Sequence, residues 1–284
     1  MSMMRKVGLQ ALLFCLAAAT SCTTVTQNRI SASVPFVTTP PSVVNAMLRL
    51  AEVSPSDTVY DLGSGDGRIV IAAARDFGAR AVGVEIDPKL VQESEHNAES
   101  AGVSSRVRFI QQDLFQADMG EATVVTLFLL PGVNVMLAPK LLKELRPGTR
   151  IVSYWYDMGE WQPDKTIPIG TLAVYYWVVP ADVGGMWTFQ IPTAEGMGPQ
   201  ILSLRQAYQN LSGSVRLHGT KLDLRDPRID GDHLCFTTSG TVGGQQVFME
   251  FSGRVQDGQA TGMVEIVGGP FSGSHQWTAQ HSPK

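Results

Sequence analysis

Cysteine is scarce in this chain. There are three in 284 residues, at positions 15, 22 and 235. Cys15 and Cys22 fall in an N-terminal segment that we expect to be a targeting sequence, so only Cys235 remains in the body of the chain. A single thiol cannot form an internal disulfide, which excludes a disulfide-stapled fold. Because it lies between Leu234 and Phe236, Cys235 is predicted to be a small buried hydrophobic residue.

Excess positive charge and metal-ligand spacing are also lacking. The net charge is −4, and no basic cluster occurs in the mature region, which argues against a general nucleic-acid binder. The five histidines show no metal-ligand spacing. His233 and Cys235 share one face of a predicted strand, but we expect no metal site there. With 44% hydrophobic residues the chain can bury a proper core.

Residues 1–22 have the composition of a targeting segment. Arg5 and Lys6 supply a charged start, and the apolar run 7–19 that follows is too short for a comfortable membrane span. We therefore leave this segment out of the predicted fold.

The targeting segment ends Ala-Thr-Ser-Cys22, which resembles a bacterial lipoprotein signal in which the cysteine becomes the lipidated N-terminus. It departs from the usual pattern because Ala19 stands where leucine is common. We expect a lipoprotein anchored to the membrane of the bacterial cell envelope, with residues 23–34 as a flexible polar tether. The alternatives are an ordinary cleaved signal or an uncleaved anchor, and an unprocessed signal would leave the protein cytoplasmic or at the inner membrane.

The segment 58–67, Thr-Val-Tyr-Asp-Leu-Gly-Ser-Gly-Asp-Gly, is the most informative stretch of the chain. An apolar strand runs into Asp61, three glycines follow at alternate positions, and a predicted helix opens at Arg68. Glycines at this spacing let the backbone turn sharply and approach a ligand closely. With a carboxylate beside the pocket, the ligand should be a nucleoside that carries a cationic group. The alternative is a tight turn without a ligand.

The glycine pattern excludes two common nucleotide loops. A dinucleotide fingerprint needs a glycine where Arg68 stands, and no phosphate loop ending in Gly-Lys-Ser/Thr is present. The pattern D-x-G-x-G-x-G resembles the loop of class I S-adenosylmethionine (SAM) methyltransferases. That resemblance implies that the methionine part of SAM is held by this loop: Asp61, Gly63, Ser64, Gly65, Asp66 and Gly67.

Two further acidic residues follow predicted strands. Within residues 81–87 we expect a second strand that ends in Glu85. This residue lies about 20 positions past the glycines, where an acid usually binds the ribose hydroxyls. A third strand, 107–111, ends near Asp113. In the family, an acid at this place accepts a hydrogen bond from the adenine amino group, with the ring between Ile86 and Leu114. The alternative for Asp113 is an ordinary surface turn residue.

Strands alternate with helices over the first part of the chain. We predict strands near 58–62, 81–85, 107–111, 122–130 and 150–156. Helices are expected near 68–76, near 88–101 with Asp87 as N-cap, and near 133–145, the last interrupted at Pro139. An earlier helix begins after Thr39, its N-cap, and a hairpin over 167–169 and 171–179 closes the sheet. This alternation predicts a doubly wound, mostly parallel, Rossmann-like sheet with its ligand at the carboxyl ends of the strands.

Composition changes near Pro180, so we place the SAM-binding domain at 35–180. Beyond it, short alternating runs and glycine-rich turns predict a small antiparallel β domain over 187–284, a barrel-like meander with one short helical turn near 206–211. We interpret this domain as a structural or docking appendage.

A closer resemblance covers residues 35–179. The segments Pro35-Phe-Val-Thr-Thr-Pro40 and 61–74, the Leu-Pro pair after strand four, and Trp161 are similar to the small lysine methyltransferases that act on the ATP synthase c-subunit and to their bacterial relatives. The resemblance implies SAM as cofactor and adds Thr39 to the cofactor-binding residues. The signal and the β domain are departures, so the identity of the substrate does not carry over.

The expected acceptor side combines apolar and aromatic residues. Enzymes that methylate base or amide nitrogens carry a polar side chain and two prolines after strand four. This chain has Leu129-Leu130-Pro131-Gly132, which weakens a DNA methyltransferase interpretation and leaves backbone carbonyls to orient an amine. We take Leu129, Leu130 and Pro131 as substrate contacts.

Tyr154-Trp155-Tyr156-Asp157 ends strand five. Aromatic faces attract cations, so Tyr154 and Tyr156 are candidates for guiding an amine, and Asp157 or Glu160 for taking its proton. The alternative for the tyrosines is core packing, which we also expect of Trp161.

The sequence thus predicts a SAM-dependent methyltransferase that acts on a protein lysine or another amine. The alternatives are a catalytically inactive SAM-binding or nucleoside-binding envelope adaptor and a small-molecule methyltransferase.

Overall fold

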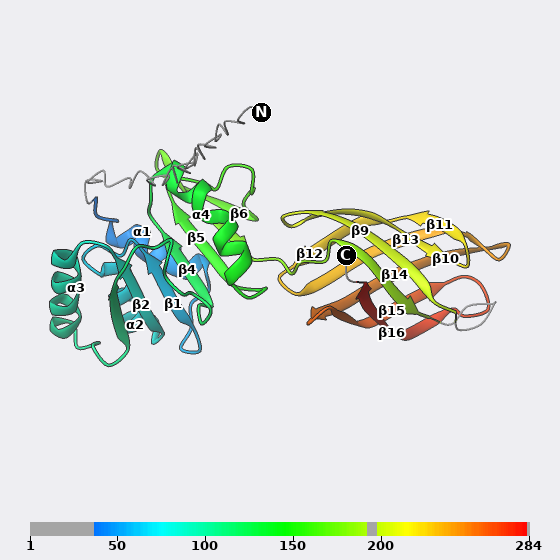
Figure 1. Ribbon diagram of the computed structural model, residues 1–284, viewed down its shortest axis with the longest axis horizontal. Coiled ribbons are helices and arrows are strands. Elements are labelled where there is room, and N and C mark those ends of the chain that lie inside the picture. Colours follow the sequence, from blue (N-terminus) through cyan, green and yellow to red (C-terminus); the bar gives the residue numbers. More distant parts are fainter. Residues whose placement is uncertain (1–36, 192–197, 283–284) are drawn as a thin grey trace, which may run out of the picture. The chain divides into compact units, whose positions relative to one another are not determined.

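The computed structural model describes residues 37–191 and 198–282, which form two separate β-sheets (Figure 1). The predicted lipidation site Cys22, the targeting segment and the tether lie outside these residues. A seven-stranded mixed sheet belongs to the first part of the chain and a nine-stranded antiparallel sheet to the second. Within the described residues, no helix has both the length and the apolar character needed to cross a membrane.

The first sheet has the strand order β3-β2-β1-β4-β5-β7-β6. Its strands are β1 (Thr58–Leu62), β2 (Arg80–Glu85), β3 (Val107–Gln111), β4 (Val124–Leu127), β5 (Arg150–Tyr154), β6 (Lys165–Ile169) and β7 (Leu172–Val178). β1 to β5 pair in parallel and β7 and β6 antiparallel. Because the order reverses beside β1, a crevice is expected at the carboxyl ends of β1 and β4.

Helices cover both faces of this sheet (Figure 1). They are α1 (Pro41–Leu50), α2 (Arg68–Phe77), α3 (Pro88–Ser100) and α4 (Pro131–Glu144). Alternate residues of a strand point to opposite faces. Val59 therefore packs in the cluster that contains Met47 of α1, whereas Tyr60 packs in the cluster that contains Leu137 of α4. The fold is the predicted doubly wound, Rossmann-like sheet.

Several predicted helix ends are wrong. The N-cap of α1 is Pro40, whose carbonyl accepts hydrogen bonds from the amides of Val43 and Val44 at 2.9 and 3.0 Å, while Thr39 is buried and makes no side-chain cap. α4 begins at Pro131 and runs through Pro139 without interruption. The proline lies on the exposed side of the helix, where the Val135 carbonyl that loses its partner can be hydrated.

Two of the predicted strands are shorter than expected. β4 covers 124–127 of the predicted 122–130. β5 ends at Tyr154 because the next residue, Trp155, has a φ of 76° and leaves the extended conformation.

The second sheet contains nine strands. They are β8 (Gly185–Gln190), β9 (Gln200–Ala207), β10 (Asn210–Leu217), β11 (Thr220–Asp223), β12 (Arg225–Asp230), β13 (His233–Val242), β14 (Gln245–Gln256), β15 (Gln259–Val267) and β16 (Gly273–Ser282). β9 pairs with both β8 and β10, which closes the sheet into a barrel. Its interior is filled by a cluster that includes Trp187, Phe236, Phe251 and Trp277.

Two predictions for this part of the chain fail. The expected helical turn at 206–211 is instead the tight connection between β9 and β10, with Tyr208 at a φ of 57°. Cys235 is half-buried on the outer face of β13, beside His233, because Leu234 and Phe236 take the inward positions of that strand.

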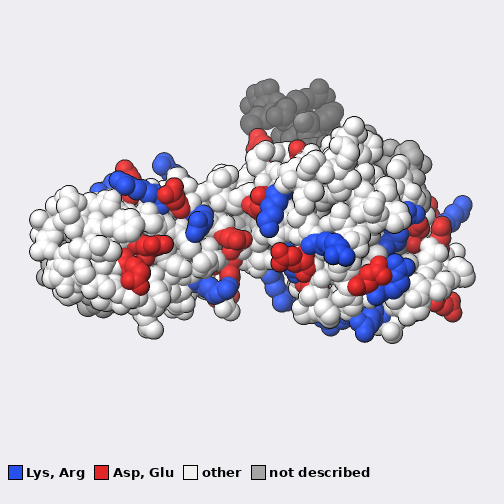
Figure 2. Space-filling model, turned by 180° about the vertical axis from the view of Figure 1, so that it is seen from behind, with Lys and Arg blue, Asp and Glu red and all other residues white. Residues whose placement is uncertain are grey.

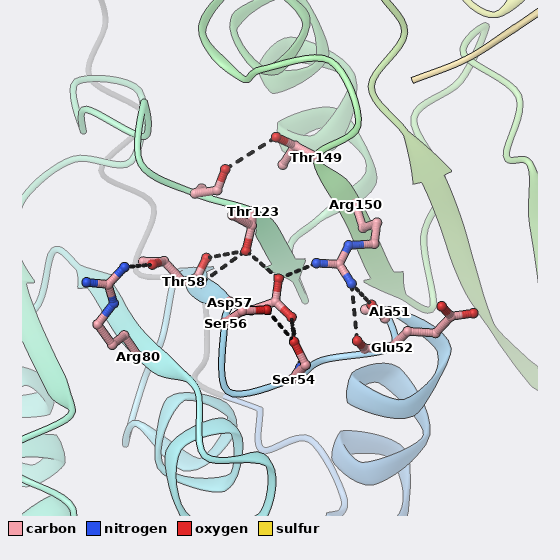
Figure 3. A network of polar contacts seen from close by, with 11 residues as sticks. Ala51, Glu52, Ser54, Ser56, Asp57, Thr58, Arg80, Thr123, Thr149 and Arg150 are labelled. Atoms are coloured by element: carbon pink, nitrogen blue, oxygen red, sulfur yellow. Dashed lines mark hydrogen bonds and ion pairs between the residues drawn. The ribbon is translucent and has the colours of Figure 1, made fainter. Parts of the chain in front are cut away.

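A polar network ties the amino ends of β1, β4 and β5 together (Figure 3). Asp57 accepts hydrogen bonds from Thr123 at 2.7 Å and from Ser54 at 2.8 Å, and it forms an ion pair with Arg150. Arg150 also donates to the carbonyl of Ala51 at 2.6 Å. Burial alone raises the pKa of Asp57, but the hydrogen bonds from Thr123 and Ser54 and the charge of Arg150 outweigh it and hold the pKa below 3.8.

We predict that Asp57→Asn destabilises the protein by about 3 kcal/mol at pH 7, because it leaves a partly buried guanidinium without its carboxylate. The lowered pKa means that this stabilisation is present above the ordinary carboxyl range and is lost as pH falls through the native pKa. Urea unfolding at pH 7 and at pH 3 checks this, and the difference between variant and wild type should shrink at pH 3.

Asp76→Asn is the matched control, since it breaks the exposed Arg75–Asp76 pair at 2.7 Å. It should change stability by less than about 1 kcal/mol at either pH. Equal effects of the two substitutions would contradict a structural role for the network.

Candidate active site

The glycine loop between β1 and α2 has a backbone that other residues rarely adopt. Gly63, Gly65 and Gly67 have φ values of 79°, 55° and 79°. The amides of Gly63 and Ser64 donate to the carbonyl of Val84 at 2.8 and 3.1 Å, which fixes the loop against the end of β2. A Cβ on Gly63 would come within 2.8 Å of the Leu129 side chain, and one on Gly67 within 2.8 Å of Phe109. The sequence pattern is therefore a steric requirement here.

Asp61 is a buried carboxylate with one side-chain partner among the residues that the structure describes. It lies in β1, is 3% exposed, and accepts a hydrogen bond from Thr126 of β4 at 2.7 Å. Burial raises the pKa of Asp61 to about 7, the negative charges of Glu85 and Asp66 add to the rise, and the Thr126 hydrogen bond opposes it. The site thus holds an excess of negative charge that a cation would relieve.

Glu85 fastens the glycine loop to the end of β2. One carboxylate oxygen accepts from the amide of Gly65 at 2.9 Å, and the other from the amides of Ile86 and Asp87 at 2.8 and 3.0 Å. Asp87 in turn caps α3 by accepting from the amide of Lys89 at 2.9 Å, as its sequence position predicts.

Asp113 stands beyond the carboxyl end of β3 and is half-buried. Its carboxylate accepts from the amide of Phe115 at 2.9 Å, which closes a short turn. Ile86 is 67% exposed and Leu114 is half-buried. Because β1, β2 and β3 are parallel neighbours, Asp61, Glu85 and Asp113 lie at one edge of the sheet.

Asp66 is held by residues that the sequence analysis did not single out. It pairs with Arg68 at 2.5 Å, and Arg68 also donates to the carbonyl of Thr39 at 3.0 Å. Asn97 of α3 donates to the Asp66 carbonyl at 3.0 Å. The sequence contains a signal for Arg68, because this arginine stands where a dinucleotide-binding loop has its third glycine. Thr39 is thereby connected to the loop through its backbone.

A cavity of about 570 Å³ lies between α1, α2 and α3. Asp66, Arg68 and Asn97 are among its lining residues, but Asp61, Glu85 and Asp113 are not. It therefore does not coincide with the edge where the three acids meet. Over residues 37–191 and 198–282, no group of three or more His, Cys, Asp or Glu side chains is arranged to hold a metal ion.

The segment after β4 borders the glycine loop. Leu129 is half-buried near Gly63, while Leu130, the N-cap of α4, and Pro131 are exposed. After β5, Tyr154 is 6% exposed and packs in the cluster that contains Met47, which favours the packing alternative for this residue. Trp161 is fully buried, as predicted.

The residues after Tyr154 are more accessible. Tyr156 is half-buried and Asp157 is exposed, with its carboxylate accepting from the amide of Gly159 at 3.0 Å. Glu160 is exposed as well. Two residues missed by sequence reasoning stand out here, Trp155 with its exposed ring and Asn134 with its buried amide. A φ above zero at a tryptophan and a buried asparagine inside a helix leave no local sequence signal.

The glycine backbone and the acids fit a cationic nucleoside. Left-handed glycines without side chains let a ligand approach the loop backbone closely, and an uncompensated carboxylate at the end of β1 suits a sulfonium compound. Fold and site together define a class I SAM-dependent methyltransferase, whose cofactor is S-adenosyl-L-methionine.

Comparison with known proteins places the chain within this class. The family model for the ANTKMT methyltransferase domain matches residues 61–165. A protein-lysine N-methyltransferase of Saccharolobus islandicus is 51% identical over 137 residues, which cover 48% of this chain and 85% of that protein. The adenine nucleotide translocase lysine N-methyltransferase of Mus musculus is 34% identical over 178 residues, which cover 63% of this chain and 74% of that protein. The chain belongs to the family of the ANTKMT methyltransferase domain.

A solved structure supports the fold and the cofactor. The crystal structure of an RNA methyltransferase from Salinibacter ruber in complex with S-adenosyl-L-homocysteine has a TM-score of 0.51 and 56% sequence identity. The match covers 52% of this chain and 96% of that chain.

We predict that Asp61→Asn stabilises the cofactor-free protein above pH 7. The native pKa of about 7 lies above the ordinary value of 3.8, so wild-type stability falls as pH rises between these values. The asparagine can keep the Thr126 hydrogen bond without a buried charge, and the gain at pH 8 should be on the order of 2–4 kcal/mol. Thermal unfolding at pH 5 and pH 8 measures it; a variant less stable than wild type at pH 8 would contradict the assigned charge state.

Proposed function

We propose that this enzyme transfers the methyl group of SAM to the side-chain amine of a protein lysine. The observation that carries the proposal is the contrast between the two sides of the site. Acidic residues and glycines line the cofactor side, whereas Leu129, Leu130 and Pro131 give the acceptor side no polar side chain to hold a base or an amide. The family relatives named as lysine N-methyltransferases support the same acceptor.

Within this proposal, the cofactor-binding residues divide by the part of SAM that they contact. Asp61 and the loop 63–67 hold the methionine part, and the Glu85 carboxylate accepts from the ribose hydroxyls while its backbone partners keep it in place. Asp113 binds the adenine amino group, with Ile86 and Leu114 on the two sides of the ring. Thr39 acts through Arg68, which ties it to Asp66.

Methyl transfer from SAM is an in-line displacement. The neutral amine attacks the methyl carbon, the bond from carbon to sulfur breaks, and S-adenosyl-L-homocysteine leaves with the electron pair. The lysine must first lose a proton, which an apolar acceptor side favours because it destabilises the ammonium form. Asp157 or Glu160, both exposed after β5, passes that proton to solvent.

RNA is the second candidate acceptor, because the Salinibacter ruber relative is named an RNA methyltransferase. Charge disfavours it in this chain. The net charge is −4, and on the face shown in Figure 2 the Lys and Arg side chains are interspersed with Asp and Glu. A phosphate backbone is bound by a continuous basic surface.

The deciding experiment incubates the purified protein and radiolabelled SAM with an envelope extract and with total RNA. Label in acid-hydrolysed methyl-lysine supports the proposal, whereas label in nuclease-sensitive material would establish the RNA alternative. Label in solvent-extractable material would identify a small-molecule enzyme. Binding of SAM without transfer to any of these would indicate an inactive adaptor.

We predict that Asp61→Ala and Gly65→Val abolish SAM binding and that Glu85→Ala weakens it by about 1–3 kcal/mol. Asp61→Ala removes the negative charge that attracts the cationic cofactor. Valine cannot adopt the backbone conformation of Gly65 without strain. Calorimetry with SAM measures the affinities, and Asp118→Ala, which replaces an exposed acid after β3, is a control. Unchanged affinity in all three variants would refute the site assignment.

We further propose that the protein is a lipoprotein of the bacterial cell envelope, anchored through Cys22. The support is the targeting composition of residues 1–22 and the small residues before the cysteine. Cys22→Ser should release the protein from membranes, as judged by fractionation, because no acyl chains can then attach. Continued membrane association of the variant would contradict lipidation.

A further inference from the structure

Trp155 has an unusual backbone and an unusual exposure. Its φ of 76° is rare for a bulky residue, and its amide donates to the carbonyl of Ala173 at 2.8 Å. Trp155 is 41% exposed, whereas the other four tryptophans of the chain are 2% exposed or less. A strained conformation that places an aromatic ring in solvent favours neither stability nor solubility, so a functional reason is expected.

The ring of Trp155 belongs to an aromatic stack beside the acceptor segment. It stacks on Tyr156 with ring centroids 5.3 Å apart and planes at 10°, and on Phe128 at 6.2 Å and 19°. At these separations the rings are offset, which leaves part of the Trp155 surface open. Phe128 follows β4 and directly precedes Leu129, whose side chain borders Gly63. The stack therefore lies at the carboxyl ends of β4 and β5, at the edge of the sheet that also carries the glycine loop.

Buried polar side chains hold this turn in place. The amide of Asn134, which is fully buried in α4, donates to the carbonyls of Tyr156 and Asp157 at 3.0 and 3.3 Å and to the Ser153 hydroxyl at 3.1 Å. Ser153 donates to the carbonyl of Tyr156 at 2.6 Å. Because Asn134 and Ser153 donate hydrogen bonds to the carbonyls just beyond Trp155, the strained backbone of Trp155 has little freedom to relax.

We propose that Trp155 is the specificity-determining residue for the methyl acceptor and that Asn134 and Ser153 are its positioning residues. The aliphatic stem of a lysine packs along the open aromatic surface, and the ring quadrupole attracts the ammonium before it loses its proton. This inference rests on the proposed lysine methylation and names the side chain that recognises the lysine, in place of the buried Tyr154.

The test uses the full chain and a panel of single-lysine peptides, with the most strongly labelled peptide taken as the acceptor. Trp155→Ala should raise the KM for that peptide about 10-fold, while affinity for S-adenosyl-L-homocysteine and kcat at saturating peptide change less than about 2-fold. Trp155→Phe should restore most of the wild-type KM. Phe248→Ala is the matched control, since Phe248 is also 41% exposed but lies in β14.

Trp155→Gly separates the ring from the backbone strain. Glycine and alanine both remove the ring, but only glycine adopts a φ of 76° without strain. The glycine variant should therefore unfold about 2–4 °C above the alanine variant, while the two share the same raised KM. If KM followed thermal stability across the two variants, the ring would have no part in recognition.

Asn134→Ala and Ser153→Ala keep the ring and loosen its support. Both should raise the peptide KM with little change in cofactor affinity, and Asn134→Ala more than Ser153→Ala because it removes more hydrogen bonds. Wild-type KM in Trp155→Ala would overturn this inference while leaving lysine methylation intact. Absence of label from every peptide and from the envelope extract would overturn the proposed function, and this inference with it.

Discussion

The hydrogen bonds of the Glu85 carboxylate are the interaction on which the site depends. They join the amide of Gly65 to those of Ile86 and Asp87, so the loop after β1 and the start of α3 are fixed to each other. The same carboxylate adds negative charge near the buried Asp61 and helps to raise its pKa to about 7. Burial is the main cause of the raised pKa of Asp61, and Glu85 adds to it while it also fixes the shape of the loop, so a cationic nucleoside suits both features of the site.

The two ends of the parallel strands carry carboxylates in opposite electrostatic states. At the amino ends, Asp57 is fully partnered by Thr123, Ser54 and Arg150, and its pKa is lowered (Figure 3). At the carboxyl ends, Asp61 has one hydroxyl partner and acidic neighbours, and its pKa is raised. The first arrangement stabilises the sheet and the second destabilises it without ligand. The stabilisation from the network at the amino ends offsets the electrostatic destabilisation that the site requires at the carboxyl ends.

The features that the sequence predicts correctly are those that depend on local backbone geometry. The alternate glycines, the acids after successive strands and the Asp87 cap are local signals, and parallel pairing was enough to gather the acids at one edge. Sequence reasoning failed where distant segments decide the outcome. Pro139 stays helical because it faces solvent, Cys235 faces outward because its neighbours fill the barrel, and Trp155 is held by α4 and β7. The roles of the individual site residues remain predictions.

Under the proposed function, the charge of the cofactor also governs the acceptor. Before SAM binds, the acidic crevice attracts cations, and a lysine ammonium is one of them. Once the sulfonium occupies the crevice, it neutralises part of that field and repels a second positive charge, which favours the neutral amine that the reaction needs. An aromatic surface suits this sequence of events better than a carboxylate would, because it attracts the ammonium on approach yet does not hold the proton in place once the amine is aligned with the methyl group.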